Sequence, residues 1–345
     1  MTCPCVCCQQ NLLTFDDFSS ANATADLRFV QSQTRYSSDV VLNRRIVERI
    51  VRCGIAHVYL RAWQSLSTVD YVADATAFTN LQLVLSIIWN CTDKSVSLCD
   101  SLARAAVANH MLTELANTRL LDADLTDDPD CHYLVKAYLG ILHNMVRMCV
   151  DSRQVFRSAG AVAVLQQYLQ RPQGLVRTKA YLILSYIVSE QENDIINATD
   201  ENIAYIVHIL QTAVASENHF SQLHAFWASE IACGLNHLAV NDGNKQRLGN
   251  LGAIDLYVQL LQGGSSDERS LAAAGLWILS FNAHNRQLML DTPDCLQGAV
   301  VYRISLQRKK IDDNIRAYVY IICVKKIFLR LSLLSAYKAF FLTRV

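Results

Sequence analysis

Four cysteines crowd the first eight residues of the chain: Cys3, Cys5, Cys7 and Cys8. Thiolates bind zinc, but zinc sites pair such a cluster with further Cys or His ligands at a fixed spacing, and no histidine lies nearby. The same thiols are also the residues that carry fatty acyl chains, and two acyl chains hold a protein stably on a membrane. An unmodified terminus is the third interpretation. We expect no metal site here and keep S-acylation as a hypothesis.

The other reactive side chains form no catalytic pattern in the sequence. Nine histidines are dispersed, without an HExxH pair or a recognisable Ser/His/Asp or Cys/His grouping. No glycine-rich phosphate loop is present, and the acidic segment 122–130 lacks the fixed ligand spacing of a calcium loop. We therefore predict a protein that is not an enzyme and needs no cofactor.

Composition and charge narrow the class of protein further. Apolar residues make up 52% of the 345 residues, and only 4 prolines and 12 glycines are present, which favours long helices over a loop-rich chain. Residues 301–345 hold ten basic and two acidic side chains, so residues 1–300 carry a net charge of −8. An acidic body argues against nucleic acid as the main ligand. The cysteines outside the N-terminal cluster are scattered through apolar stretches and no secretory signal is evident, which predicts a reduced, cytoplasmic protein.

One sequence motif occurs twice along the chain. Residues 158–169 read SAGAVAVLQQYL and residues 250–261 read NLGAIDLYVQLL, so Gly160-Ala161 returns as Gly252-Ala253, 92 positions later. This distance equals two units of about 46 residues, a period typical of stacked helical repeats. Each copy follows a polar stretch and precedes an apolar helix. The sequence therefore predicts an all-α solenoid of units with a short first helix, a second helix and a longer, buried third helix.

We divide the chain into three parts on this basis. Residues 1–35 are expected to be a disordered, Cys-containing N-terminus, 36–300 a helical repeat domain of about five units, and 301–345 a basic, apolar tail or cap. A membrane span in the tail is not expected, because Lys325, Lys326 and Arg330 interrupt its apolar runs. A surface-bound amphipathic helix, a cap on the last repeat and a non-native end stay open as interpretations of this tail.

The repeats resemble the armadillo family of three-helix units. The resemblance is carried by the Gly-Ala pairs, by Asn193-Asp194, by Asn244-Lys-Gln-Arg and by the Leu-rich second helices, and it is clearest over residues 134–300. It implies a right-handed α-solenoid. Residues 178–196 and 226–261 also look like armadillo regions of invertebrate proteins that carry Toll/interleukin-receptor signalling domains, although no such domain is visible here.

Armadillo proteins often bind an extended peptide along a groove of third helices, where an Asn on each helix bonds the peptide backbone. The resemblance implies a partner-binding groove formed by Asn90, Asn144, Asn236 and Asn282, with Trp89, Tyr181 and Trp277 as apolar neighbours. In peptide-binding members a Trp commonly precedes the Asn by one turn. This chain departs from that pattern, with Gly140 before Asn144. The alternative interpretation is that these amides tie neighbouring helices together or cap them.

The resulting functional prediction is a non-catalytic scaffold or adaptor that binds a protein or peptide partner along the inner face of the solenoid. Two alternatives stay open. One is a regulatory armadillo region of a signalling protein whose effector domain lies elsewhere, and the other is an S-acylated, membrane-attached scaffold. Membrane contact through the cysteines or the tail is not the favoured interpretation, and the sequence does not predict an oligomeric state.

Overall fold

The computed structural model describes residues 21–34, 47–48, 52, 55–67, 74–292 and 295. The N-terminal cysteines and the tail 301–345 lie outside the described residues. The chain divides into two compact units, 1–187 and 188–345. The first helix among the described residues is α2 (Ala21–Thr34), which corrects part of the prediction that residues 1–35 are disordered.

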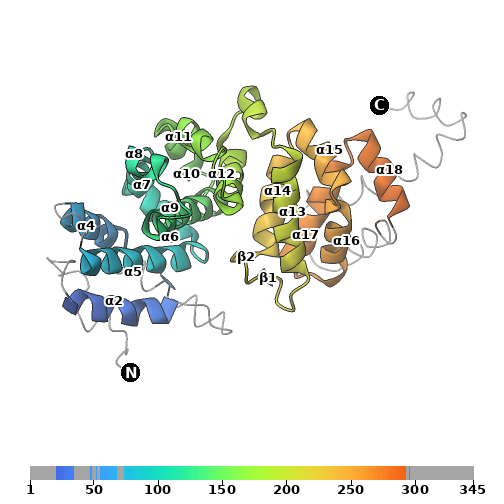
Figure 1. Ribbon diagram of the computed structural model, residues 1–345. Helices are drawn as coiled ribbons and strands as arrows, with labels where there is room; N and C mark the ends of the chain where they lie inside the picture. The colour runs from blue at the N-terminus through green and yellow to red at the C-terminus, as the bar shows by residue number, and fades with distance from the viewer. Residues whose placement is uncertain are drawn as a thin grey trace, which may run out of the picture. The chain divides into compact units, whose positions relative to one another are not determined.

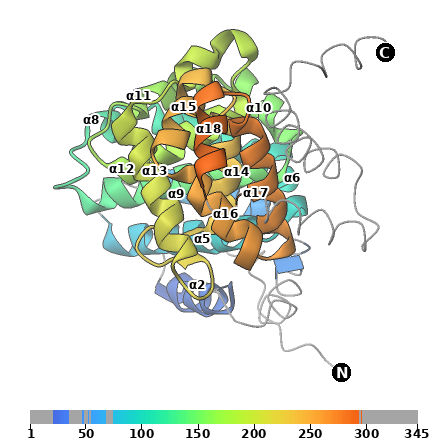
Figure 2. The ribbon, with the colours of Figure 1, turned by 90° about the vertical axis from the view of Figure 1, so that its right-hand side faces the viewer.

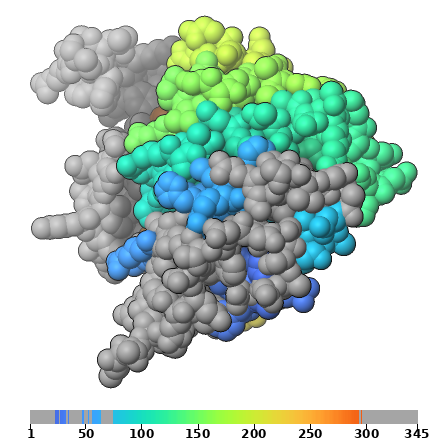
Figure 3. Space-filling view, turned by 90° about the vertical axis from the view of Figure 1, so that its left-hand side faces the viewer, coloured from blue at the N-terminus to red at the C-terminus, as the bar shows by residue number. Residues whose placement is uncertain are grey.

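The N-terminal unit contains a row of four long helices. These are α2, α5 (Ala75–Thr92), α9 (Pro129–Met148) and α12 (Gly174–Ile187), and each packs against the next (Figure 1). Shorter helices join them: α4 (Ile55–Ser67), α6 (Val96–Arg104), α7 (Val107–Leu115), α8 (Thr118–Asp122), α10 (Ser152–Ser158) and α11 (Ala161–Tyr168). In the space-filling view of this side the colours change in bands from blue through cyan to green, so consecutive segments lie in consecutive layers (Figure 3).

Local sequence explains where the long helices begin. The Asp74 carboxylate accepts the backbone N–H groups of Thr76 and Ala77 at the start of α5. Asp128 does the same for α9, whose first residue is Pro129. A side-chain acceptor satisfies otherwise unpaired donors of the first turn, and proline suits the first helical position because it lacks an N–H group. The polar loops before α5 and α9 thus determine the residue at which each of these two helices begins.

The C-terminal unit repeats the same plan with one insertion. Its elements are the 3-10 helix η2 (Glu190–Ile196), α13 (Asp200–Val214), β1 (Phe220–Ser221), β2 (Phe226–Trp227), α14 (Ala228–Leu238), α15 (Asp242–Asn250), α16 (Ala253–Gly263), α17 (Ser266–Leu279) and α18 (Ala283–Asp291). Figure 2 shows α13, α14, α16 and α17 side by side. These elements give each unit the all-α architecture that the sequence predicts.

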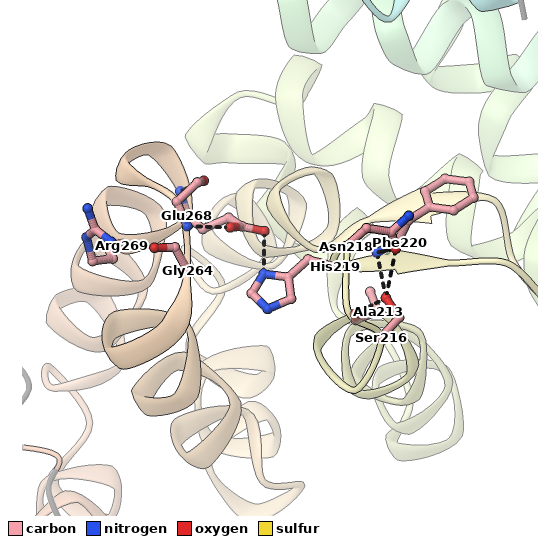
Figure 4. Close-up of polar contacts among 9 residues, drawn as sticks. Ala213, Ser216, Asn218, His219, Phe220, Gly264, Glu268 and Arg269 are labelled. Atoms are coloured by element: carbon pink, nitrogen blue, oxygen red, sulfur yellow. Dashed lines mark hydrogen bonds and ion pairs between the residues drawn. The ribbon is translucent and has the colours of Figure 1, made fainter. Parts of the chain in front are cut away.

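The insertion is a small hairpin that the sequence did not predict. Strands β1 and β2 pair antiparallel, with Phe220 opposite Trp227. The Ser216 hydroxyl accepts the backbone N–H of Phe220 at 2.8 Å, and the His219 imidazole Nδ1 lies 2.9 Å from the Glu268 carboxylate at the start of α17 (Figure 4). Helix α14 begins only after this hairpin, at Ala228.

The three-helix unit itself is confirmed, most clearly in α10–α11–α12 and α15–α16–α17. Gly160 and Gly252 precede the second helices with φ of 74° and 86°. Only glycine adopts this left-handed backbone without steric strain, which explains why the Gly-Ala phrase recurs. Both units thus follow the order of a short first helix, a second helix and a longer third helix that the sequence indicated.

In four of the described helices that follow a long third helix, a buried polar side chain joins consecutive repeats. The side chains are those of Cys99, Ser152, Asn244 and Asn285. They donate to the backbone carbonyls of Thr92, Met145, Leu238 and Leu279, respectively, at or near the end of the preceding third helix. Carbonyls at a helix C-terminus have no partner within the helix, so these contacts satisfy groups that would otherwise be buried and unpaired.

Among the residues that the structure describes, none of the helices combines the length and apolar character that a membrane span requires.

Candidate functional site: the third-helix face of the N-terminal unit

The predicted groove residues fall in both units. Trp89 and Asn90 lie on α5, Asn144 on α9 and Tyr181 on α12, whereas Asn236 and Trp277 lie on α14 and α17 of the C-terminal unit. The placement of Asn282 on a third helix was wrong. Helix α17 ends at Leu279, and the Asn282 side chain accepts the N–H of Asn285 as the N-cap of α18.

The amides of Asn90 and Asn144 bond the preceding long helix. Asn90 Nδ2 donates to the Thr34 hydroxyl at 3.4 Å, and Asn144 Nδ2 donates to the Thr92 hydroxyl at 3.2 Å. Thr34 and Thr92 are the last residues of α2 and α5, so both bonds join equivalent ends of neighbouring helices. This geometry corresponds to the helix-tying alternative, with each amide donating within the protein.

The side chain of Asn236 also forms its hydrogen bonds within its own unit. Its Nδ2 donates to the Leu271 carbonyl at 2.9 Å, and its Oδ1 accepts from the Tyr257 hydroxyl at 2.8 Å. Trp277 packs edge-to-face against Phe281, with ring centroids 4.9 Å apart, and Phe281 is 53% exposed. In the C-terminal unit the predicted Asn therefore stabilises the stack, while the aromatic pair lies nearer the surface.

The Trp89 ring packs on α9 at Gly140, where the helix carries no side chain. A methyl group on Gly140 would lie 2.8 Å from the indole Nε1 and closer still to Cε2 and Cζ2, so the ring packs directly on the glycine. The Lys179 ammonium of α12 lies 4.8 Å from the centroid of the same ring. Lys179 is only 3% exposed, so this cation–π contact is largely shielded from water. The absence of a side chain at Gly140 thus lets α5 and α12 meet across α9.

Further polar contacts align the three helices along their length. Gln31 Nε2 donates to the Ser86 hydroxyl at 2.9 Å, and the Tyr133 hydroxyl donates to the Gln82 carbonyl at 2.8 Å. At the other end Arg147 pairs with Asp93 at 2.7 Å. Gln82 precedes Asp93 along the chain, and their partners Tyr133 and Arg147 follow in the same order. The helices therefore run parallel, with one face of each forming a continuous surface.

A cavity of about 390 Å³ opens on this surface. It is lined by Arg28 and Gln31 of α2, by Thr79, Gln82, Leu83 and Ser86 of α5, and by Tyr133 of α9. The predictions made from the sequence did not include this cavity. The available signal was the spacing of Thr79, Gln82 and Ser86, which places three polar side chains on one face of a helix.

Burial sets the protonation states beside this surface. Burial raises the pKa of the Tyr133 hydroxyl to about 12, so the group stays protonated and can donate. Burial, with smaller contributions from the nearby charges of Arg147 and Lys179, lowers the pKa of His143 well below its ordinary value. His143 is therefore a neutral, packed residue of α9. The described residues contain no group of three or more His, Cys, Asp or Glu side chains placed to hold a metal ion.

Comparison with known proteins gives similarities of fold at low sequence identity. No protein-family model matches the chain, and no curated protein matches it. Among solved structures, an engineered protein (Northeast Structural Genomics Consortium target OR329) is 15% identical, with 79% of this chain and 94% of that chain covered and a TM-score of 0.44. A designed armadillo repeat protein, YIII(Dq)4CqI, is also 15% identical, with 78% and 97% covered and a TM-score of 0.44. What this chain binds must be inferred from its own side chains.

Proposed function

We propose that the protein is a non-catalytic scaffold whose N-terminal unit binds an extended segment of a partner polypeptide across α2, α5 and α9. The observation that carries this proposal is the cavity formed jointly by these three parallel helices, whose lining combines polar side chains with apolar surface. Rigid secondary elements hold the lining groups in place, so a bound segment meets donors and acceptors that are already oriented.

The lining suits a peptide backbone. Gln82 offers a side-chain amide, while the Thr79 hydroxyl donates to the Ala75 carbonyl and Gln31 Nε2 donates to the Ser86 hydroxyl, so these three groups offer a peptide unit mainly their acceptor oxygens. Leu83 adds an apolar contact. The proposed surface differs from the predicted groove, because none of the seven predicted groove residues lines the cavity. It does not extend along α12, where Tyr181, Ser185 and Tyr186 are buried.

The alternative predictions concern other parts of the protein. S-acylation depends on Cys3, Cys5, Cys7 and Cys8, outside the described residues, and a regulatory role depends on an effector domain beyond this sequence. Both stay predictions, as does a cytoplasmic location.

The test is selection of ligands from a displayed library of random dodecapeptides, followed by anisotropy titrations of labelled peptides from the enriched pool. A Gln82→Trp variant places an indole in the cavity and should abolish binding. The matched variant Gln166→Trp makes the same change at an exposed position of α11, and should bind as the wild type does. Equal binding by both variants would place the peptide elsewhere and refute the proposal.

A further inference from the structure

We infer that the partner segment is acidic and that Arg28 and Lys136 receive its carboxylates. This inference rests on the proposed function and adds the chemistry of the partner. It follows from the distribution of charge over the long helices and from the contacts that each cation makes.

The row of long helices is basic, although the first 300 residues are acidic overall. Helix α5 contains no charged residue. Helices α2, α9 and α12 together hold five basic residues, Arg28, Lys136, Arg147, Arg177 and Lys179, against the two acidic residues Asp26 and Asp130. On α2, α5 and α9, which line the cavity, the basic residues are Arg28, Lys136 and Arg147 and the acidic residues are Asp26 and Asp130, so the contacts that each cation makes decide which of them can receive a ligand.

Three of these cations already have partners inside the unit. Arg147 pairs with Asp93, Lys179 lies over the Trp89 ring, and Arg177 donates to the carbonyls of Arg171 and Pro172. These groups hold the helices and the loop before α12 in place.

Arg28 and Lys136 differ from the other three. Within the described part of the chain neither takes part in an ion pair or a hydrogen bond, and Arg28 is exposed while Lys136 is half-buried. A cation held on a rigid helix without an anionic neighbour retains its full capacity to pair with a carboxylate from a ligand.

Arg28 and Lys136 lie on two of the three helices that line the cavity. Arg28 lines it from α2. Lys136 follows Tyr133, the lining residue of α9, by three positions and so lies on the same face of that helix. Among the residues that the structure describes, no carboxylate lines the cavity. Asp130 lies in the first turn of α9, where it is stabilised by the positive end of the helix dipole. An acidic segment would meet one cation on each of the outer helices, whereas a basic segment would meet no carboxylate in the cavity.

The experiment is the dodecapeptide selection repeated with wild type, Arg28→Glu, Lys136→Glu and Arg104→Glu. Each substitution changes the charge by the same amount. Arg104 lies on α6, outside the lining of the cavity, with a 78% exposed side chain that pairs with Asp100, so it is the control for a charge reversal at a distance from the cavity. Thermal unfolding of each variant verifies that it is folded.

We expect an enriched pool rich in Asp and Glu, whose affinity falls by about tenfold in Arg28→Glu and in Lys136→Glu, and stays unchanged in Arg104→Glu. If the enriched peptides are neutral or basic and the Gln82→Trp variant does not bind them, the inference of an acidic partner is refuted and the scaffold proposal stands. Acidic peptides that bind all variants equally, Gln82→Trp included, would overturn both.

Discussion

Substitution of Gly140 by alanine tests the contact on which the third-helix face of the N-terminal unit depends. Gly140 lies inside the long helix α9, where alanine is normally the better residue. Helix propensity alone predicts that Gly140→Ala stabilises the protein by about 1 kcal/mol. The structure predicts the opposite sign, because the added methyl group overlaps the Trp89 indole.

The magnitude follows from two effects. Forcing a methyl group into a packed site destabilises by about 1–3 kcal/mol. Displacement of Trp89 also loses the cation–π contact with Lys179, which contributes about 0.5–2 kcal/mol in a shielded site. Against the gain in helix propensity, we expect Gly140→Ala to lower the free energy of unfolding of the N-terminal unit by about 1–3 kcal/mol.

Urea denaturation followed by circular dichroism measures this change, and a double-mutant cycle assigns its cause. In a Trp89→Ala background the methyl group of Gly140→Ala meets no indole. There the substitution should be neutral or stabilising. A stabilising effect of Gly140→Ala in the wild type, or an equal destabilisation in both backgrounds, would refute the packing of Trp89 on Gly140.

Three further outcomes follow from buried groups. Asn244→Ala leaves three backbone partners without a bond and should destabilise by about 3 kcal/mol or more, whereas Asn285→Ala loses two bonds and should cost less; the reverse order in urea denaturation would contradict this. Burial lowers the pKa of His110 to about 4, so the folded state resists protonation, and stability should fall by roughly 3 kcal/mol as the pH drops from about 6.5 toward 4. His110→Gln should remove that part of the pH dependence, and an unchanged pH profile would exclude His110 as its source. Burial raises the pKa of Cys99 to about 12, so alkylation at pH 8, mapped by mass spectrometry, should label Cys99 only after unfolding; equal rates in the folded and unfolded protein would contradict its burial.

The repeat architecture was predictable because its signals are local. Gly160 and Gly252 mark positions that require a left-handed backbone, and Pro129 marks the first residue of a long helix. The hairpin before α14 was not predictable in the same way. Its two-residue strands are too short to show alternation, and tertiary contacts such as that between His219 and Glu268 hold it in place.

The candidate site was less predictable, since it depends on which helices are neighbours. Hydrophobic periodicity showed that Asn144 lies on a long buried helix. It did not show that the Thr92 hydroxyl, at the end of the preceding long helix, accepts a hydrogen bond from the Asn144 amide. Asn282 shares the spacing of the other candidates but lies beyond the end of α17, and the sequence misplaced it because element boundaries are the least certain part of such predictions.

Polar residues of the long helices serve two purposes, and the structure separates them. Asn90 and Asn144 donate to threonines at the helix ends and so stabilise the stack, while Thr79 and Gln82 line the open cavity. Substitutions in the first pair should act mainly on unfolding, and those in the second mainly on binding. The family resemblance pointed to the asparagines because a surface amide suits a peptide ligand. Once those amides bond within the protein, the ligand-binding role passes to the polar groups that the stack leaves open, which is why we assign it to the face of α2, α5 and α9.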